Sequence, residues 1–199
     1  MSKGEQTRRN ILNRALAMAS EVGMEGLSIG ALAEEARLSK SGLFAHFKSK
    51  EALQLEVLQE AINRFTAQVV QPVLAAPRGE ARLRLLFDRY LEWLRGEDDR
   101  LGCPFQKMAA EYSNRSGPVR DRLVESMNDW REQVARVVSS AVSAGYLRAD
   151  LDVGVFVHEF AGIAMVFQQS CRLLRDPQAE ARARKVFEAL LLRSRSVPA

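Results

Sequence analysis

Hydrophobic residues recur at helical spacing along almost the whole chain. Apolar positions return about every three or four residues, and no sustained alternation of apolar and polar residues indicates a strand. All six prolines stand at the ends of these periodic segments, where helices tolerate them. The pattern predicts an all-α protein with about nine helices.

Local signals set the expected helix ends. We expect helices over about residues 5–22, 29–36, 40–46, 50–71, 80–94, 104–113, 118–144, 153–174 and 177–193. Ser28, Ser39 and Ser49 are expected N-caps, because a serine oxygen accepts hydrogen bonds from the unpaired N–H groups of a first helical turn. Asp176 followed by Pro177 marks the start of the last helix.

Residues 27–53 predict two short helices joined by a tight turn. Leu43 and Phe47 lie on the inner face of the second helix, and Leu38 fills the turn between the two. Ala33 and Ala36 are small enough to let the helices cross closely. This is the layout of a helix-turn-helix, whose second helix enters the major groove of DNA.

The charge distribution points to the same end of the chain. The net charge is +4, and residues 1–50 carry eight Lys and Arg against five Asp and Glu. The remaining residues are nearly neutral, with 21 bases and 20 acids. A basic segment is typical of a surface that binds a polyanion, although chance asymmetry on solvated faces explains the charge equally well.

The exposed face of the second short helix is expected to read DNA. Lys40 can donate to the guanine acceptors, and Ser39 stands where helix N–H groups favour a phosphate. His46 is either a phosphate contact or a packing residue, and Phe44 either packs or contacts DNA. The expected DNA-contacting residues are Ser28, Arg37, Ser39, Lys40, Ser41, Gly42, Phe44, Ala45, His46 and Lys50.

The runs 29–36, 38–40, 43–47 and 50–53 together resemble the signature of the TetR family of transcriptional regulators, over about residues 8–60. Three positions depart from the usual pattern of that family: Arg37 replaces Gly in the turn, Phe44 replaces Tyr, and Gly42 replaces Thr. The departure at Arg37 implies either a strained or altered turn backbone, or an added phosphate contact. Operator recognition would then depend on Lys40, His46, Lys50 and backbone N–H groups.

The resemblance implies a nine-helix architecture with two domains. The N-terminal three-helix domain with the helix-turn-helix is assigned to residues 1–50, and the C-terminal ligand-binding and dimerisation domain to residues 51–199. It further implies a repressor that binds a palindromic operator in double-stranded DNA as a dimer. A small-molecule inducer would release the repressor, and an electrophilic or aromatic compound is one interpretation of that inducer.

Aromatic and methionine side chains with a few polar neighbours favour a ligand site in the C-terminal domain. Simple core packing is the alternative for most of them. Cys103 stands at a helix start, where a thiolate is favoured, but a buried inert thiol is the other interpretation. The expected ligand-contacting residues are Phe65, Gln68, Phe87, Tyr90, Cys103, Phe105, Met108, Tyr112, Trp130, Phe167 and Gln168.

The last two predicted helices carry more apolar surface than one monomer needs. Each has apolar residues on two faces, so a four-helix bundle formed with a second copy would bury the surplus. We therefore expect a homodimer through about residues 153–174 and 177–193.

The sequence shows no pattern typical of a catalytic, metal-binding or membrane-spanning protein. HExxH, GxSxG and P-loop patterns do not occur, so no enzyme activity and no cofactor are expected. Cys103 and Cys171 lie far apart, which favours a reduced, cytoplasmic protein. No apolar run approaches the roughly 18 residues of a membrane span. Two rivals remain: an architectural DNA-binding protein without a ligand, and a helical enzyme or carrier with a vestigial head.

Overall fold

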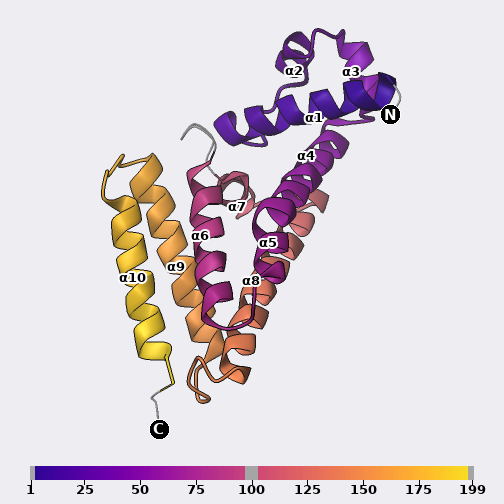
Figure 1. Ribbon diagram of the computed structural model, residues 1–199. Helices are drawn as coiled ribbons and strands as arrows, with labels where there is room; N and C mark the ends of the chain where they lie inside the picture. The colour runs from indigo at the N-terminus through magenta and orange to yellow at the C-terminus, as the bar shows by residue number, and fades with distance from the viewer. Residues whose placement is uncertain (1–2, 97–102, 197–199) are drawn as a thin grey trace. The chain divides into compact units, whose positions relative to one another are not determined.

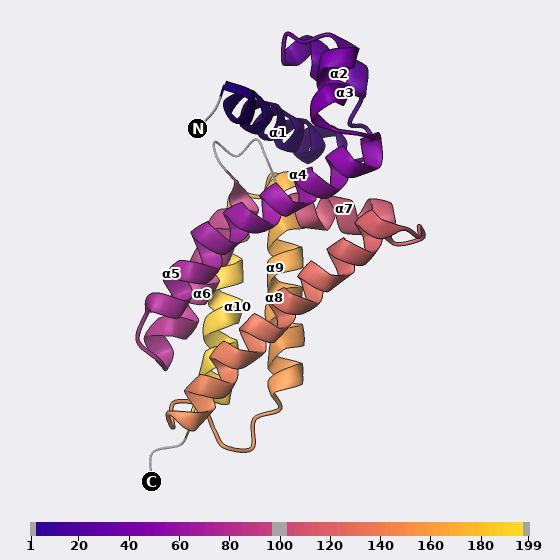
Figure 2. The same cartoon turned by 90° about the vertical axis from the view of Figure 1, so that its right-hand side faces the viewer.

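The computed structural model describes residues 3–96 and 103–196, and the regular structure in these ranges is helical apart from one isolated bridge between Leu147 and Arg195 (Figures 1 and 2). The elements are α1 (Lys3–Val22), α2 (Ile29–Glu35), α3 (Lys40–His46), α4 (Lys50–Phe65), η1 (Thr66–Val70), α5 (Gln71–Ala75), α6 (Glu80–Arg95), α7 (Pro104–Tyr112), α8 (Pro118–Ser143), α9 (Val153–Arg172) and α10 (Ala179–Ser194). Since α4, η1 and α5 are continuous, the described residues form nine helices, as predicted.

The three serine caps are confirmed. Ser28 Oγ accepts from the Ala31 N–H at 3.4 Å, and Ser39 Oγ accepts from the Gly42 N–H at 3.0 Å. Ser49 Oγ accepts from the N–H of the third helical residue of α4, also at 3.0 Å. Each serine thus pairs one N–H group that has no partner within its own helix.

The last helix begins two residues later than predicted. Asp176 Oδ1 accepts from the Gln178 N–H at 2.9 Å, and the Asp176 carbonyl accepts from the Ala179 N–H at 3.1 Å. These bonds close a turn ahead of α10, so Asp176 ends the preceding loop and is not the N-cap of the helix.

The long fourth helix passes through Pro72 and ends at Ala75, four residues beyond its predicted end. A proline inside an α-helix removes an N–H and clashes with the carbonyl four residues earlier. Here the preceding turn is a π-helix, in which the Gln71 N–H donates to the Thr66 carbonyl. The wider turn directly before Pro72 accommodates its ring, and this local adjustment leaves the helix continuous.

The residues divide into two compact units. Unit 1 comprises Met1–Arg64 and Cys103–Met127, and unit 2 comprises Phe65–Gly102 and Asn128–Ala199. The division falls inside α8, and it assigns α7 to unit 1. The functional boundary expected at residue 50 concerns which residues bind DNA, and it stays a prediction.

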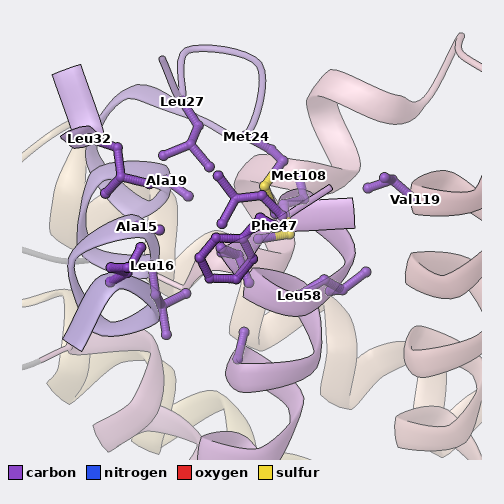
Figure 3. Packing of buried hydrophobic residues seen from close by; sticks show 14 of the residues in the cluster. Ala15, Leu16, Ala19, Met24, Leu27, Leu32, Phe47, Leu58, Met108 and Val119 are labelled. Carbon is purple, nitrogen blue, oxygen red and sulfur yellow. The ribbon is translucent and has the colours of Figure 1, made fainter. Parts of the chain in front are cut away.

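The core of unit 1 is built around Phe47, the residue that follows α3. Its side chain is 1% exposed and lies among Met24, Met108 and Leu58 (Figure 3). These neighbours come from the α1–α2 loop, α7 and α4. Leu43 of α3 belongs to the same cluster. The two buried side chains fix α3 on the core and leave its other face exposed.

The core of unit 2 joins α6, α9 and α10. The rings of Phe87 and Phe187 stack with centroids 3.9 Å apart, and Phe160 meets Phe87 at 6.0 Å with its ring nearly perpendicular. Figures 1 and 2 both show α9 and α10 side by side. These aromatic contacts hold the two last helices against α6.

The turn between α2 and α3 places Arg37 in the left-handed region, with φ of 56°. The Leu38 N–H donates to the Ala33 carbonyl at 2.8 Å, and the Arg37 N–H donates to the Glu34 carbonyl at 3.0 Å. This pair of bonds defines a Schellman motif, whose left-handed position is usually glycine. Of the two backbone alternatives, the structure shows strain: the turn keeps its ordinary hydrogen bonds, and Arg37 occupies the left-handed position that glycine usually fills.

The burial of Phe47 predicts a large loss of stability in Phe47→Ala. We expect the free energy of unfolding to fall by about 3–5 kcal/mol, because a cavity replaces the ring. Phe44→Ala is the matched control, since Phe44 is 47% exposed, and it is expected to change stability by less than about 0.5 kcal/mol. Urea unfolding followed by circular dichroism at one protein concentration measures both. Phe47→Leu keeps the comparison possible if the alanine variant does not fold, and equal losses at the two positions would contradict the packing.

The strain at Arg37 predicts that Arg37→Gly stabilises the protein by about 0.5–1 kcal/mol, since glycine adopts positive φ without a Cβ clash but loses more chain entropy on folding. Arg9→Gly within α1 is the control, because there the same substitution is expected to cost about 1 kcal/mol of helix stability. The same urea titration compares the two variants. A loss of stability in Arg37→Gly would show that the arginine side chain makes a stabilising contact larger than the strain.

Candidate nucleic-acid interface and ligand site

Helix α3 divides into a buried face and an exposed face, as predicted. Lys40, Ser41, Phe44 and Ala45 are exposed, as are Ser28, Arg37, Ser39 and Lys50 of the expected interface. Gly42 and His46 are half-buried. The ring of Phe44 is therefore largely outside the core, and its contact with DNA stays a prediction.

The start of α3 is already partly hydrogen-bonded. Ser39 Oγ accepts from the Gly42 N–H and lies 3.0 Å from Ser41 Oγ. A Cβ built on Gly42 would lie 3.2 Å from Ser39 Oγ, so glycine gives the cap its room. Lys40 runs past Gly30 of α2, where a Cβ would lie 3.4 Å from Lys40 Cε. The two glycines thus set how the polar groups of the exposed face are arranged.

Lys50 has a partner within the protein. Its ammonium donates to the main-chain carbonyl of Glu25 at 3.0 Å and lies 3.8 Å from Glu25 Oε2. The sequence offered two interpretations for Lys50, a phosphate contact and a solvated lysine. The structure adds a third environment, in which the ammonium bridges the first turn of α4 and the α1–α2 loop.

Glu25 is the centre of a polar cluster that the sequence analysis missed. The Tyr112 hydroxyl donates to Glu25 Oε1 at 2.9 Å, and Arg115 lies 3.1 Å from Oε2. Gln54 Nε2 donates to the same carboxylate at 3.3 Å and to the Met24 carbonyl at 3.0 Å. Every member belongs to unit 1. The partners of Glu25 lie far from it in sequence, and a single sequence carries no signal for such pairs.

The cluster shifts the pKa values of the Glu25 carboxyl and the Tyr112 hydroxyl. Burial raises the pKa of the Glu25 carboxyl, but the hydrogen bond from Tyr112 and the charges of Lys50 and Arg115 together outweigh it, so the pKa lies below its usual range. Burial, and then the hydrogen bond to Glu25, raise the pKa of Tyr112. At neutral pH the pair is therefore a carboxylate that accepts a hydrogen bond from a neutral phenol.

Helix α7 also contacts the end of α1. Glu111 Oε2 accepts from the Met24 N–H at 2.8 Å. The other carboxylate oxygen of Glu111 lies directly over Gly23, where a Cβ would be only 1.6 Å away. Gly23 has a φ of 88°, so glycine serves both the backbone and the close approach. Lys107 donates to the main-chain carbonyl of Glu21. The C-terminal end of α1 is thereby paired to α7.

The expected ligand residues fall into both units. Phe65, Tyr90 and Trp130 come together in unit 2, where Phe65 and Trp130 are 4.7 Å apart and Tyr90 and Trp130 are 5.0 Å apart. Trp93 and Phe160, which were not in the expected set, complete this ring cluster through Phe65 and Tyr90. Phe87 stacks in the neighbouring core, and Phe167 is buried.

Two glutamines of the expected site differ in their surroundings. Gln68 is exposed. Gln168, on α9, has a buried Oε1 with no hydrogen-bond partner among the described residues. Gln168 follows Phe160 by two helical turns, so the two share a face of α9. A buried carbonyl oxygen without a donor is costly, and a ligand donor is one way to satisfy it.

The four expected ligand residues at α7 belong to unit 1. Met108 and Tyr112 are buried in its hydrophobic core, and Phe105 packs against that core. Cys103 is buried at the start of α7, which favours its interpretation as an inert thiol. A contact of these residues with a ligand stays a prediction.

Within residues 3–96 and 103–196, no helix combines the length and apolar character needed to span a membrane. In the same ranges, no group of three or more His, Cys, Asp or Glu could hold a metal ion.

Comparison with known proteins matches most of the chain to one family. Residues 11–57 match the bacterial regulatory proteins of the tetR family, and residues 79–187 match the tetracyclin repressor-like C-terminal domain. The HTH-type transcriptional repressor DhaR of Mycobacterium sp. (strain GP1) is 25% identical over 147 residues, which cover 72% of this chain and 71% of DhaR.

Solved structures share the fold. A TetR transcriptional regulator from Chloroflexus aurantiacus J-10-FL superposes with a TM-score of 0.84 at 20% identity, covering 96% of each chain. AibR, solved with isovaleryl coenzyme A and operator DNA, superposes with a TM-score of 0.71 at 20% identity, covering 93% of this chain and 96% of its own. Because the two family matches include the helix-turn-helix and span more than half of the chain, this protein belongs to the TetR family of DNA-binding transcription regulators, which are not enzymes.

Proposed function

We propose that this protein is a cytoplasmic repressor that binds a palindromic operator as a homodimer and is released when a small molecule binds its C-terminal domain. The observation that carries the proposal is the exposed face of α3, held on the core by Leu43 and Phe47. The repressor DhaR and the operator complex of AibR support it as relatives.

The proposed DNA contacts combine charge, exposed polar groups and one exposed ring. Lys40 suits a guanine edge or a phosphate, and Arg37 is exposed in the turn directly before α3. Phe44 lacks a hydroxyl, so its exposed ring suits an apolar contact such as a thymine methyl group. Ser39 and Ser41 suit phosphate oxygens.

The outer faces of α9 and α10 support the proposed homodimer. Large apolar side chains are exposed on both helices, and a two-fold interface would bury the same patch on each copy. The exposed members are Val155, Met165, Val166, Leu173 and Leu174 from α9 and the residues that follow it, and Val186 and Leu192 from α10. A dimer through these faces would present two α3 helices to a palindrome.

The proposal predicts that Met165→Glu breaks the dimer and weakens operator binding at least about tenfold, because the interface would bury an unpaired carboxylate. Met165 is 61% exposed in the monomer, so the variant is expected to fold. Met127→Glu on α8, at a methionine that is 40% exposed, is the matched control and is expected to stay dimeric. Sedimentation velocity and gel-shift titrations on palindromes from upstream of its own or adjacent genes measure both properties. A wild-type protein that binds no such palindrome contradicts the proposed function.

The ring cluster and Gln168 support a ligand site in unit 2. Aromatic side chains favour an apolar or aromatic ligand, and the unpaired Oε1 of Gln168 favours a ligand with an O–H or N–H donor. AibR binds isovaleryl coenzyme A, so acyl-coenzyme A thioesters and hydroxylated aromatic compounds form the first screening panel.

We expect an inducer from this panel to lower operator affinity. The Gln168→Leu variant is expected to bind that inducer about five- to tenfold more weakly, because one hydrogen bond is lost. Without ligand, Gln168→Leu is expected to be as stable as the wild type or more so, because it removes a buried unpaired oxygen. Gln68→Leu, at an exposed glutamine, is the control and is expected to retain ligand binding. Isothermal titration calorimetry and thermal unfolding measure these effects. Operator binding that no compound weakens would favour the architectural rival.

A further inference from the structure

We propose that Glu25 regulates DNA affinity by holding the ammonium of Lys50, and that α7 sets the strength of this hold through Tyr112 and Arg115. The inference rests on the proposed function, because it takes Lys50 as a contact of the operator backbone. It adds a positioning residue, Glu25, that lies outside the expected DNA interface.

Glu25 and a DNA phosphate would compete for the ammonium group of Lys50. Lys50 is the first residue of α4, and its Nζ reaches both the carbonyl and the carboxylate of Glu25. A lysine ammonium has three donors and no acceptor. A DNA phosphate would therefore have to share this ammonium with Glu25 or displace the carboxylate. Since Glu25 is ionised at neutral pH, it opposes a phosphate contact by occupying the cation.

Arg115 and Tyr112 connect this competition to α7. Arg115, three residues after the end of α7, lies 3.1 Å from Glu25 Oε2, whereas Lys50 lies 3.8 Å from the same oxygen. The two cations thus share one oxygen, and the shorter distance belongs to Arg115. Tyr112 holds the other oxygen by its hydroxyl. If α7 shifts and withdraws Arg115, the carboxylate interacts more strongly with Lys50, and DNA affinity falls.

The expected size of the effect is modest. The side chains of Lys50 and Glu25 are 43% and 36% exposed, so solvent screens their attraction. Exposed ion pairs of this kind change an equilibrium by about two- to fivefold. Such a change adjusts the operator affinity of a repressor that binds through several phosphates. It is small enough that Glu25→Gln and Lys50→Met are both expected to retain measurable DNA binding.

The DNA experiment is a double-mutant cycle on the whole 199-residue chain with Glu25→Gln and Lys50→Met. Glutamine keeps the acceptor oxygen for Tyr112 and Gln54 but removes the charge. We expect Glu25→Gln to bind the operator about two- to fivefold more tightly, and to make no difference in the Lys50→Met background. Glu34→Gln on α2 is the control for a general loss of negative charge. An equal gain in both Lys50 backgrounds, or weaker binding by Glu25→Gln, would overturn the proposal.

Arg115→Gln tests the link to α7 in the same cycle. It is expected to weaken operator binding about two- to fivefold when Lys50 is present, because Oε2 is left to the lysine. In the Lys50→Met background this loss is expected to disappear. A loss that persists there would mean that Arg115 acts on DNA directly, and it would overturn the link to α7.

A measurement without DNA separates this inference from the proposed function. Competitive acetylation with trace acetic anhydride, read by mass spectrometry, compares Lys50 with its exposed neighbour Lys48. In the wild type we expect Lys50 to react more slowly than Lys48, and in Glu25→Gln we expect only the Lys50 rate to rise, by about two- to fivefold. If Lys50 reacts as fast as Lys48, and its rate is unchanged in Glu25→Gln, then Glu25 does not hold the Lys50 ammonium. The inference then fails, even if operator binding by this protein has been demonstrated. The predicted rate change would support the hold itself even if no operator were found.

Discussion

A seven-residue helix is not stable in water by itself, because nucleation fixes several dihedral angles for few hydrogen bonds. Helix α3 has this length, and its fixed position depends on the burial of Leu43 and Phe47 in the core of unit 1. The same burial leaves Lys40, Ser41 and Phe44 on the opposite face. The exposed face proposed to read DNA is thus a direct consequence of the hydrophobic packing beneath it. The strained turn at Arg37 is retained because that packing fixes both helices.

The core that holds α3 also includes residues of α7. Met108 of α7 is buried beside Phe47 (Figure 3). Glu111 and Tyr112 form hydrogen bonds with the loop that joins α1 to α2. A change in the position of α7 would therefore alter both the apolar support of α3 and the polar contacts around Glu25. In a marginally stable protein, contacts worth about 1 kcal/mol are enough to shift affinity severalfold.

Unit 2 combines close aromatic packing with one unsatisfied polar atom. The rings of Phe65, Tyr90 and Trp130 contact one another, whereas Gln168 Oε1 is buried without a donor among the described residues. Packing alone would favour an apolar residue in place of Gln168, because an unpaired buried oxygen destabilises the fold. The proposed ligand site would account for the glutamine, and the proposed homodimer would account for the exposed apolar faces of α9 and α10.

The sequence by itself determined the features that depend on neighbouring residues. The nine helices, the caps at Ser28, Ser39 and Ser49, and the inner face of α3 all follow from local propensity and periodicity. The resemblance to a family with glycine in the turn likewise offered a strained backbone at Arg37 as one of its alternatives, and the positive φ of Arg37 agrees with it. Tertiary structure decided the assignment of α7 to unit 1 and the cluster around Glu25, whose partners Tyr112 and Arg115 lie about ninety residues away. It also decided that Lys50 has a partner within the protein. These contacts depend on how distant segments meet, and a pattern of apolar positions fixes which face of a helix is buried but not which polar groups meet at its edge.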